Sequence, residues 1–163
     1  MLAGCLEVSP EQMPITSEQR EFVYEYAVPD QTKAELFRAA RSNFAVAYGN
    51  SREVDWLEDE GQGTIIGKAI APWNLTIGTI PVQSVPCASN YNLVFIAKDG
   101  RARLELSLLE EVALPSSCGW KLPSKRDYPQ VVEHFQRAFE TLGNALHSKS
   151  AIDRLKNFKA AAV

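Results

Sequence analysis

The residues of this chain best suited to chemistry are its three cysteines, Cys5, Cys87 and Cys118. A cysteine thiolate is a nucleophile and a metal ligand, and two thiols can be oxidised to a disulfide. The spacing of the three cysteines matches neither a CxxC redox motif nor a set of zinc ligands. We therefore consider acylation of one sulfur and a disulfide between the other two, and we expect no metal site.

Cys5 ends the stretch Leu2-Ala3-Gly4-Cys5, in which small residues precede a nucleophilic sulfur. This stretch resembles the lipobox of bacterial lipoproteins, where a peptidase cuts before the cysteine and the thiol is acylated. The basic and apolar parts of a signal peptide that should precede the box are missing, so we expect a truncated signal whose beginning lies upstream of Met1. The alternative is a short disordered N-terminus with an incidental cysteine.

Residues 6–19 contain two prolines, several glutamates and serines, and no hydrophobic periodicity. This composition is typical of an extended, solvated segment, so residues 1–19 are predicted to be a truncated lipoprotein signal and a tether. Acyl chains contribute about 0.8 kcal/mol per buried methylene, so an acylated Cys5 would hold the protein on a membrane. The residue after the cysteine is Leu6. In enterobacterial lipoproteins an aspartate at this position favours the inner membrane, so by resemblance to that rule Leu6 favours the outer membrane. We expect a lipid-anchored protein of the bacterial cell envelope that faces the periplasm, at the outer membrane rather than the inner one.

Catalytic motifs are absent from the sequence, which contains no GxSxG, Walker loop, HExxH or GxGxxG after a strand. The two histidines, His134 and His147, could face one side of a predicted helix as metal ligands or general bases. Two solvated helix histidines are the expected outcome, and Glu133 does not change it because adjacent helix residues diverge. We expect no cofactor and no catalytic residue; an enzyme with an unrecognised site near Glu133 and His134 is the alternative.

The composition is that of a globular domain, since 45% of the 163 residues are hydrophobic and 23% are charged. The formal net charge of −3 would repel nucleic acid unless a local basic patch overcame it. No run of about 18 apolar residues exists, so no transmembrane helix is expected. We predict one domain at residues 20–148, followed at residues 149–163 by a tail that is a short docking helix or a frayed end.

Residues 22–28 alternate and are rich in aromatic and β-branched types, which predicts a strand that ends at Pro29. Asp30 or Thr32 then caps a helix, and Thr32 with Glu35 has the spacing of a capping box. The helix stops at Gly49. Its apolar face comprises Leu36, Phe37, Ala40, Phe44, Ala47 and Tyr48.

Two further strands are predicted at residues 52–57 and 64–71, separated by the acidic turn Glu58-Asp59-Glu60-Gly61. The acidic side chains could bind a cation, but a solvated turn is expected because calcium loops need alternating oxygen ligands. Residues 72–90 contain three prolines and predict a long irregular loop, with or without an extra strand pair, that packs back on the domain.

Asp99-Gly100 is a strong signal for a two-residue hairpin turn between strands predicted at residues 91–98 and 101–110. The turn fixes the register, which pairs Ala97 with Ala102, Phe95 with Leu104, Leu93 with Leu106, and Tyr91 with Leu108. These side chains all point to one face, which must be the core. The other face, with Val94, Ile96, Arg103, Glu105 and Ser107, is expected to be partly solvated.

A last helix is predicted to begin at Asp127 or Tyr128, with a buried stripe of Val131, Phe135, Phe139, Leu142 and Leu146. The predicted order is therefore β-α-β-β-β-β-α. Strands that are grouped rather than alternating with helices predict an α+β fold, with an antiparallel sheet of about five strands and two helices packed on one face.

This order resembles a family of uncharacterised bacterial envelope proteins, described as a domain of unknown function with a TATA-binding-protein-like (TBP-like) fold. The matching parts are residues 22–28, 36–44 and 63–68, and the turn Lys98-Asp99-Gly100-Arg101 with Arg103 and Leu104. The resemblance covers roughly residues 20–146 and departs at residues 72–90. It implies a fold and an envelope location, and no functional residue can be carried over because fold does not fix function.

Cys87 and Cys118 are predicted in loops at the same end of the hairpin strands. An oxidising periplasm would permit a disulfide between them, and two buried free thiols are the alternative.

A surface for an envelope protein partner is predicted on the open sheet face and in the proline-rich segment. Its residues are Trp73, Leu75, Ile77, Val94, Ile96 and Arg103. Exposed apolar patches mark partner sites. For Trp73 and the apolar residues after it, the commoner outcome is that they cover the edge or end of the sheet as core. The hypothesis is a non-catalytic binding or structural module, and the oligomeric state stays open.

Overall fold

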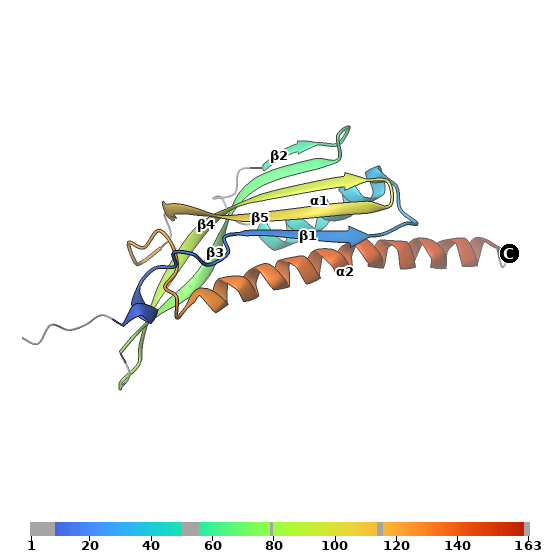
Figure 1. Cartoon of the computed structure of the whole chain (residues 1–163). Helices are drawn as coiled ribbons and strands as arrows, with labels where there is room; N and C mark the ends of the chain where they lie inside the picture. Colours follow the sequence, from blue (N-terminus) through green and yellow to red (C-terminus); the bar gives the residue numbers. More distant parts are fainter. Residues whose placement is uncertain (1–8, 50–55, 79, 114–115, 162–163) are drawn as a thin grey trace, which may run out of the picture.

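Five antiparallel strands form one sheet in the computed structural model, which describes residues 9–49, 56–78, 80–113 and 116–161. The strands are β1 (Glu21–Ala27), β2 (Trp56–Asp59), β3 (Thr64–Ile77), β4 (Gln83–Lys98) and β5 (Arg101–Val112), in the order β1-β5-β4-β3-β2 across the sheet. Helices α1 (Lys33–Tyr48) and α2 (Tyr128–Ala161) lie on one face, and the 3-10 helix η1 (Pro10–Gln12) precedes β1 (Figure 1). The predicted α+β fold and its element order are confirmed.

The β4–β5 hairpin lies at the centre of the sheet and has the predicted register. Gly100 has a φ of 77°, in the left-handed region that the tight turn requires. All four predicted residue pairs are formed, and their eight side chains are buried. Val94, Ile96 and Arg103 alternate with these residues and lie on the opposite face, where they are partly or fully exposed.

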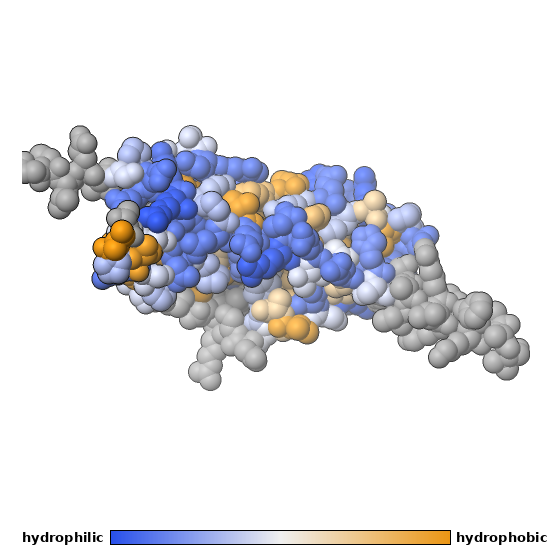
Figure 2. Space-filling view, turned by 90° about the horizontal axis from the view of Figure 1, so that it is seen from below, coloured by the Kyte–Doolittle hydropathy of each residue, from blue (hydrophilic) through white to orange (hydrophobic). Residues whose placement is uncertain are grey.

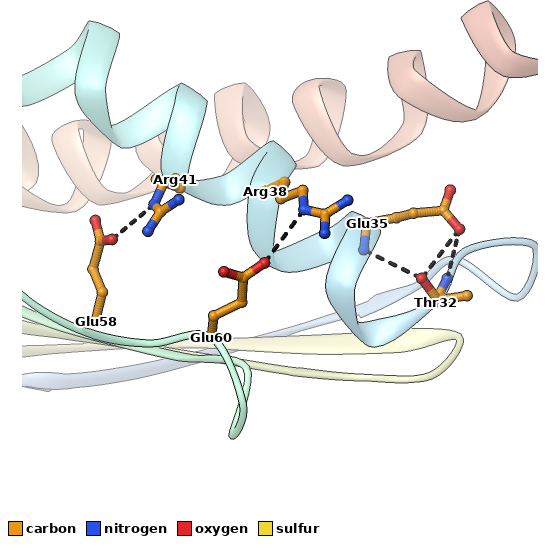
Figure 3. Close-up of polar contacts among 6 residues, drawn as sticks. All are labelled: Thr32, Glu35, Arg38, Arg41, Glu58 and Glu60. Atoms are coloured by element: carbon orange, nitrogen blue, oxygen red, sulfur yellow. Dashed lines mark hydrogen bonds and ion pairs between the residues drawn. The ribbon is translucent and has the colours of Figure 1, made fainter.

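Helix α1 begins at the predicted capping box. The Thr32 hydroxyl accepts a hydrogen bond from the Glu35 N–H at 3.2 Å, and the Glu35 carboxylate accepts one from the Thr32 N–H at 3.4 Å (Figure 3). Asp99 of the β4–β5 turn accepts the Lys33 N–H at 2.8 Å. The turn that sets the sheet register therefore also satisfies an N–H that has no partner within α1.

The acidic residues near the end of β2 pair with arginines of α1. Glu58 contacts Arg41 at 2.7 Å and Glu60 contacts Arg38 at 3.3 Å (Figure 3). The predicted turn starts later than expected, because Glu58 and Asp59 belong to β2. Each exposed pair contributes at most about 1 kcal/mol, and together they hold the edge strand β2 against α1.

Residues 72–90, predicted to be largely irregular, are instead the long arms of β3 and β4. Pairing runs unbroken from Thr64 with Ile96 to Ile77 with Gln83. Pro72 and Pro86 lie opposite Ala88 and Asn74, whose N–H groups donate outward to side chains beyond the ladder. Each proline thus occupies a position whose N–H would point away from the partner strand, where no ladder hydrogen bond is lost.

Helix α2 continues without a break to Ala161, so the predicted tail is the end of a long helix and not a separate element. Its predicted stripe is confirmed: Val131, Phe135, Leu142 and Leu146 are buried, and Phe139 is half-buried. The Phe139 ring stacks on Tyr24 of β1 with centroids 4.5 Å apart. None of the helices among the described residues is both long and apolar enough to cross a membrane.

Asp127, directly before α2, is a buried carboxylate that joins distant parts of the chain. It accepts hydrogen bonds from the Thr76 N–H at 3.0 Å, the Thr76 hydroxyl at 2.7 Å and the Ser124 hydroxyl at 2.7 Å. The Gln130 side-chain amide donates a fourth at 3.2 Å. A buried carboxylate needs such donors, and the N-terminus of a helix also favours its negative charge. Asp127 therefore locks β3 to the start of α2.

Replacing Asp127 by alanine leaves the Thr76 N–H without its acceptor. We expect Asp127→Ala to lower the free energy of unfolding by about 3 kcal/mol, because hydrogen bonds to charged groups contribute about 1.5–3 kcal/mol. Urea denaturation followed by tryptophan fluorescence measures the loss. Glu133→Ala is the control, since it removes only an exposed ion pair with Arg137 on the same helix and should cost less than about 0.5 kcal/mol. Equal stability of the two variants would contradict the role of Asp127.

Candidate functional site

The sheet face opposite the helices carries a row of aliphatic side chains that crosses four of the five strands. The register places Leu57 beside Ile66 and Ile66 beside Val94, and Glu105 then separates Val94 from Val23 of β1. Leu57 is 72% exposed, Ile66 and Val23 are exposed, and Val94 is half-buried. We call this set, Leu57, Ile66, Val94 and Val23, the open-face row.

Charged side chains border the open-face row at the end of the sheet near the β4–β5 turn. Arg103 lies between Glu25 at 3.3 Å and Glu105 at 3.5 Å. Glu25 and Arg103 help to form a shallow hollow of about 390 Å³, which is also lined by Tyr26, Ile96, Lys98, Arg101 and Ala102. An apolar row with a charged border has the arrangement of a protein interface, in which an apolar centre is surrounded by a polar rim.

A second polar group borders the row on the other side. Lys68 of β3 pairs with Glu111, and Glu111 also accepts a hydrogen bond from the Asn90 amide at 2.7 Å. The contact with Lys68 is the larger cause and the contact with Asn90 the smaller one of a pKa of the Glu111 carboxyl that lies below its usual value. The carboxylate is therefore ionised at neutral pH, and the rim is charged on both sides.

Two of the residues predicted for the partner surface belong to the core instead. Trp73 is only 2% exposed, its indole N–H donates to the Ser89 hydroxyl at 2.9 Å, and its ring packs edge-on against Trp120. Leu75 is also buried. Both point to the helix side because β3 keeps its two-residue alternation through the proline-rich segment. Ile77, at the end of β3, is exposed.

Cys87 and Cys118 form a disulfide, with Cα atoms 5.4 Å apart. Of the two alternatives, paired or free thiols, the structure has the pair. Beside it the Ser117 N–H donates to the Pro86 carbonyl at 3.2 Å. The bond spans 31 positions of the sequence, so in the chain-entropy picture it stabilises the fold by roughly 3–4 kcal/mol. The loop after β5 is thereby held against the β4 arm. Cys5 lies outside the described residues.

A chain of hydrogen bonds that the sequence pattern did not indicate crosses the core. The hydroxyls of Tyr48 and Tyr91 are 2.8 Å apart, and the Tyr91 hydroxyl is 3.3 Å from Nε2 of His134. Burial raises the pKa of both tyrosines and lowers that of His134, with the Arg137 charge as a smaller cause. The three residues come from α1, β4 and α2, so no local motif reveals the group.

Glu133 and His134, the pair named for an enzyme, do not share a site. His134 turns inward to Tyr91, whereas Glu133 is exposed and pairs with Arg137 at 2.6 Å. Neither residue lines the shallow hollow at the β4–β5 turn or a second groove, which is lined by Met13 and Trp120 among others. His147 is exposed one turn after Gly143. Within the described part of the chain, no cluster of three histidine, cysteine or acidic side chains could hold a metal ion.

Two solved structures have the same architecture. A DUF4468 family protein from Bacteroides ovatus is 15% identical, with a TM-score of 0.60 over 83% of this chain and 90% of that one. A TBP-like protein from Parabacteroides distasonis is 14% identical, with a TM-score of 0.60 over 84% of this chain and 98% of that one. The chain has a TBP-like fold. No family model matches the sequence, and no curated protein matches it significantly.

At this level of identity the TBP-like fold establishes the architecture alone, and the expected resemblance to a domain of unknown function is confirmed in that sense. The residues that act must therefore be argued from the surface of this chain. The open-face row lies on the face of the sheet opposite its buried residues, and the two helices leave that face uncovered (Figure 1).

The half-buried imidazole of His134 should make the stability of this TBP-like domain depend on pH. Burial lowers the pKa of His134 in the folded state. Below about pH 6.5 the unfolded chain therefore binds a proton at His134 more readily than the folded protein does. The free energy of unfolding should therefore fall as the pH drops from about 7.5 through 6.5. His134→Phe, which keeps an aromatic ring beside Tyr91, should flatten this dependence in denaturation curves.

His147→Phe is the control, because it makes the same replacement at an exposed position of the same helix. An unaltered pH dependence in His134→Phe would contradict the assignment.

Proposed function

We propose that this chain is a non-catalytic binding domain of the bacterial cell envelope, anchored by lipid at Cys5 and facing the periplasm. The open-face row is the observation that carries the binding part. Leu57, Ile66 and Val94 lie side by side on adjacent strands, and Val23 follows beyond Glu105. Charged groups flank this row on both sides, and no helix of the described residues covers it. The partner that suits this surface is an envelope protein with a complementary apolar patch.

The envelope location is supported by two features that are independent of each other. The stretch Leu2-Ala3-Gly4-Cys5 resembles a lipobox, and Leu6 after it favours the outer membrane. The Cys87–Cys118 disulfide suits an oxidising compartment, and disulfides are rare where thiols are kept reduced. A periplasmic domain satisfies both features.

The charges of the open face favour a protein over nucleic acid. Arg103 lies between two glutamates, and Lys68 is paired with Glu111. A surface that binds phosphates instead needs unpaired basic side chains, and the formal net charge of the chain is −3. The geometry therefore supports a mixed interface with a protein.

A photo-crosslinking amino acid placed at position 66 tests the proposed interface in detergent-solubilised membranes of the host. We expect crosslinks from position 66 to one envelope protein, because this position lies in the middle of the open-face row. Leu57→Arg on the same chain should weaken the crosslink about tenfold, as expected for a charge placed within an apolar interface, next to position 66.

The same crosslinker at Val46, an exposed aliphatic residue of α1, is the matched control and should give no such product. Equal labelling from positions 66 and 46, or full labelling in Leu57→Arg, would reject the open face as the binding surface.

A further inference from the structure

The hairpin formed by the far ends of β3 and β4 is uncharged and projects beyond the rest of the sheet (Figure 1). No Asp, Glu, Lys or Arg occurs from Ala69 to Ala97. Ile80, at the tip, is 95% exposed, and Ile77 and Val82 beside it are also exposed. Figure 2 shows the resulting hydrophobic cluster at the end of the molecule where the hairpin projects. We call Ile77, Ile80 and Val82 the hairpin tip.

The hairpin tip and the N-terminal segment are held by one loop. Thr76, next to Ile77, is bound by Asp127 through two hydrogen bonds. The two residues before Asp127, Lys125 and Arg126, donate their N–H groups to the carbonyls of Met13 and Glu11, both at 2.9 Å. The hairpin tip therefore lies at the same end of the domain at which the chain enters from its N-terminus (Figure 1).

This end is also close to the proposed lipid anchor. Ser9, the first described residue, follows Cys5 by four positions, which a fully extended chain spans in about 14 Å at most. A lipid on Cys5 therefore keeps this end of the domain near the bilayer surface. The opposite end, where α2 terminates, points away from it (Figure 1).

A groove at the same end has side chains that suit the headgroup region of a bilayer. It has a volume of about 590 Å³ and an apolar lining that includes Met13, Ile15, Trp120 and Leu122. Lys121 and Lys125 line it as well, together with Glu110. Tryptophan is favoured at the boundary between water and lipid, and lysine can bury its stem while its ammonium group meets phosphate.

We propose that the hairpin tip is a second membrane contact, which inserts its aliphatic side chains among the lipid headgroups of the bilayer that holds the anchor. This inference rests on the proposed acylation of Cys5. A bilayer is favoured over a protein partner because the tip lacks any charged or directional group and lies beside the anchor. Three aliphatic side chains bind a bilayer weakly by themselves, and the anchor supplies the high local concentration that makes them effective.

Chemical coupling of Cys5 to a lipid tests the contact without the host's acylation machinery. Cys87 and Cys118 are joined to each other, which leaves Cys5 as the remaining thiol for a maleimide lipid in phosphatidylethanolamine–phosphatidylglycerol vesicles. Ile80→Trp reports the position of the tip, with lipids brominated near the headgroup as quenchers. Relative to the wild type, we expect the added emission to shift to the blue and to lose intensity in brominated vesicles.

Val46→Trp is the matched control, since Val46 is 89% exposed on α1 and away from the hairpin. Its added emission should stay unshifted and unquenched on the same vesicles. An Ile80→Trp signal that matches this control would overturn the membrane contact and would leave a protein as the occupant of the tip. Because the coupling supplies the anchor, such a result would not bear on whether the host acylates Cys5.

Discussion

The buried carboxylate of Asp127 is the interaction on which the shape of this domain depends. It is removed from water, so it is stable only while Thr76 and Ser124 donate to it, and this requirement joins β3, α2 and the preceding loop. The same loop binds the N-terminal segment through backbone hydrogen bonds. One end of the molecule therefore gathers the chain's entry point, the projecting hairpin and a groove with two lysines, whereas the open face lies along the side of the sheet.

Features set by neighbouring residues could be predicted from the sequence, and features set by distant ones could not. The Asp99-Gly100 turn and the Thr32 cap depend on a few adjacent positions, and both formed with the expected geometry. The sequence leaves residues 72–90 open between an irregular loop and an extra strand pair, because Pro72 is compatible with a strand only if its nitrogen points away from the partner strand, which pairing alone decides. One local signal was available for the start of α2. Ser124, three positions before Asp127, is a typical helix-capping residue, and its hydroxyl accepts the Asp127 N–H.

The candidate surfaces show the same division. The open-face residues of β4 and β5 followed from the hairpin register, but the whole row became visible only when β2 and β1 took their places on either side. The Tyr48–Tyr91–His134 chain joins residues 43 positions apart in each step, beyond any periodicity. For Trp73 the sequence leaves both a partner surface and the core open, because its segment reads as irregular; once β3 is continuous, alternation alone places that ring in the core. If both proposals hold, the domain stands on a membrane by its anchor and its hairpin tip and presents the open sheet face sideways to a partner.

The central claim is that the chain is held on a membrane through the sulfur of Cys5, and the mass of the intact protein purified from its native host tests it most directly. A protein that begins at Cys5 and carries the added mass of acyl chains is the predicted result. A protein that keeps Met1 and an unmodified thiol at Cys5 would contradict the claim.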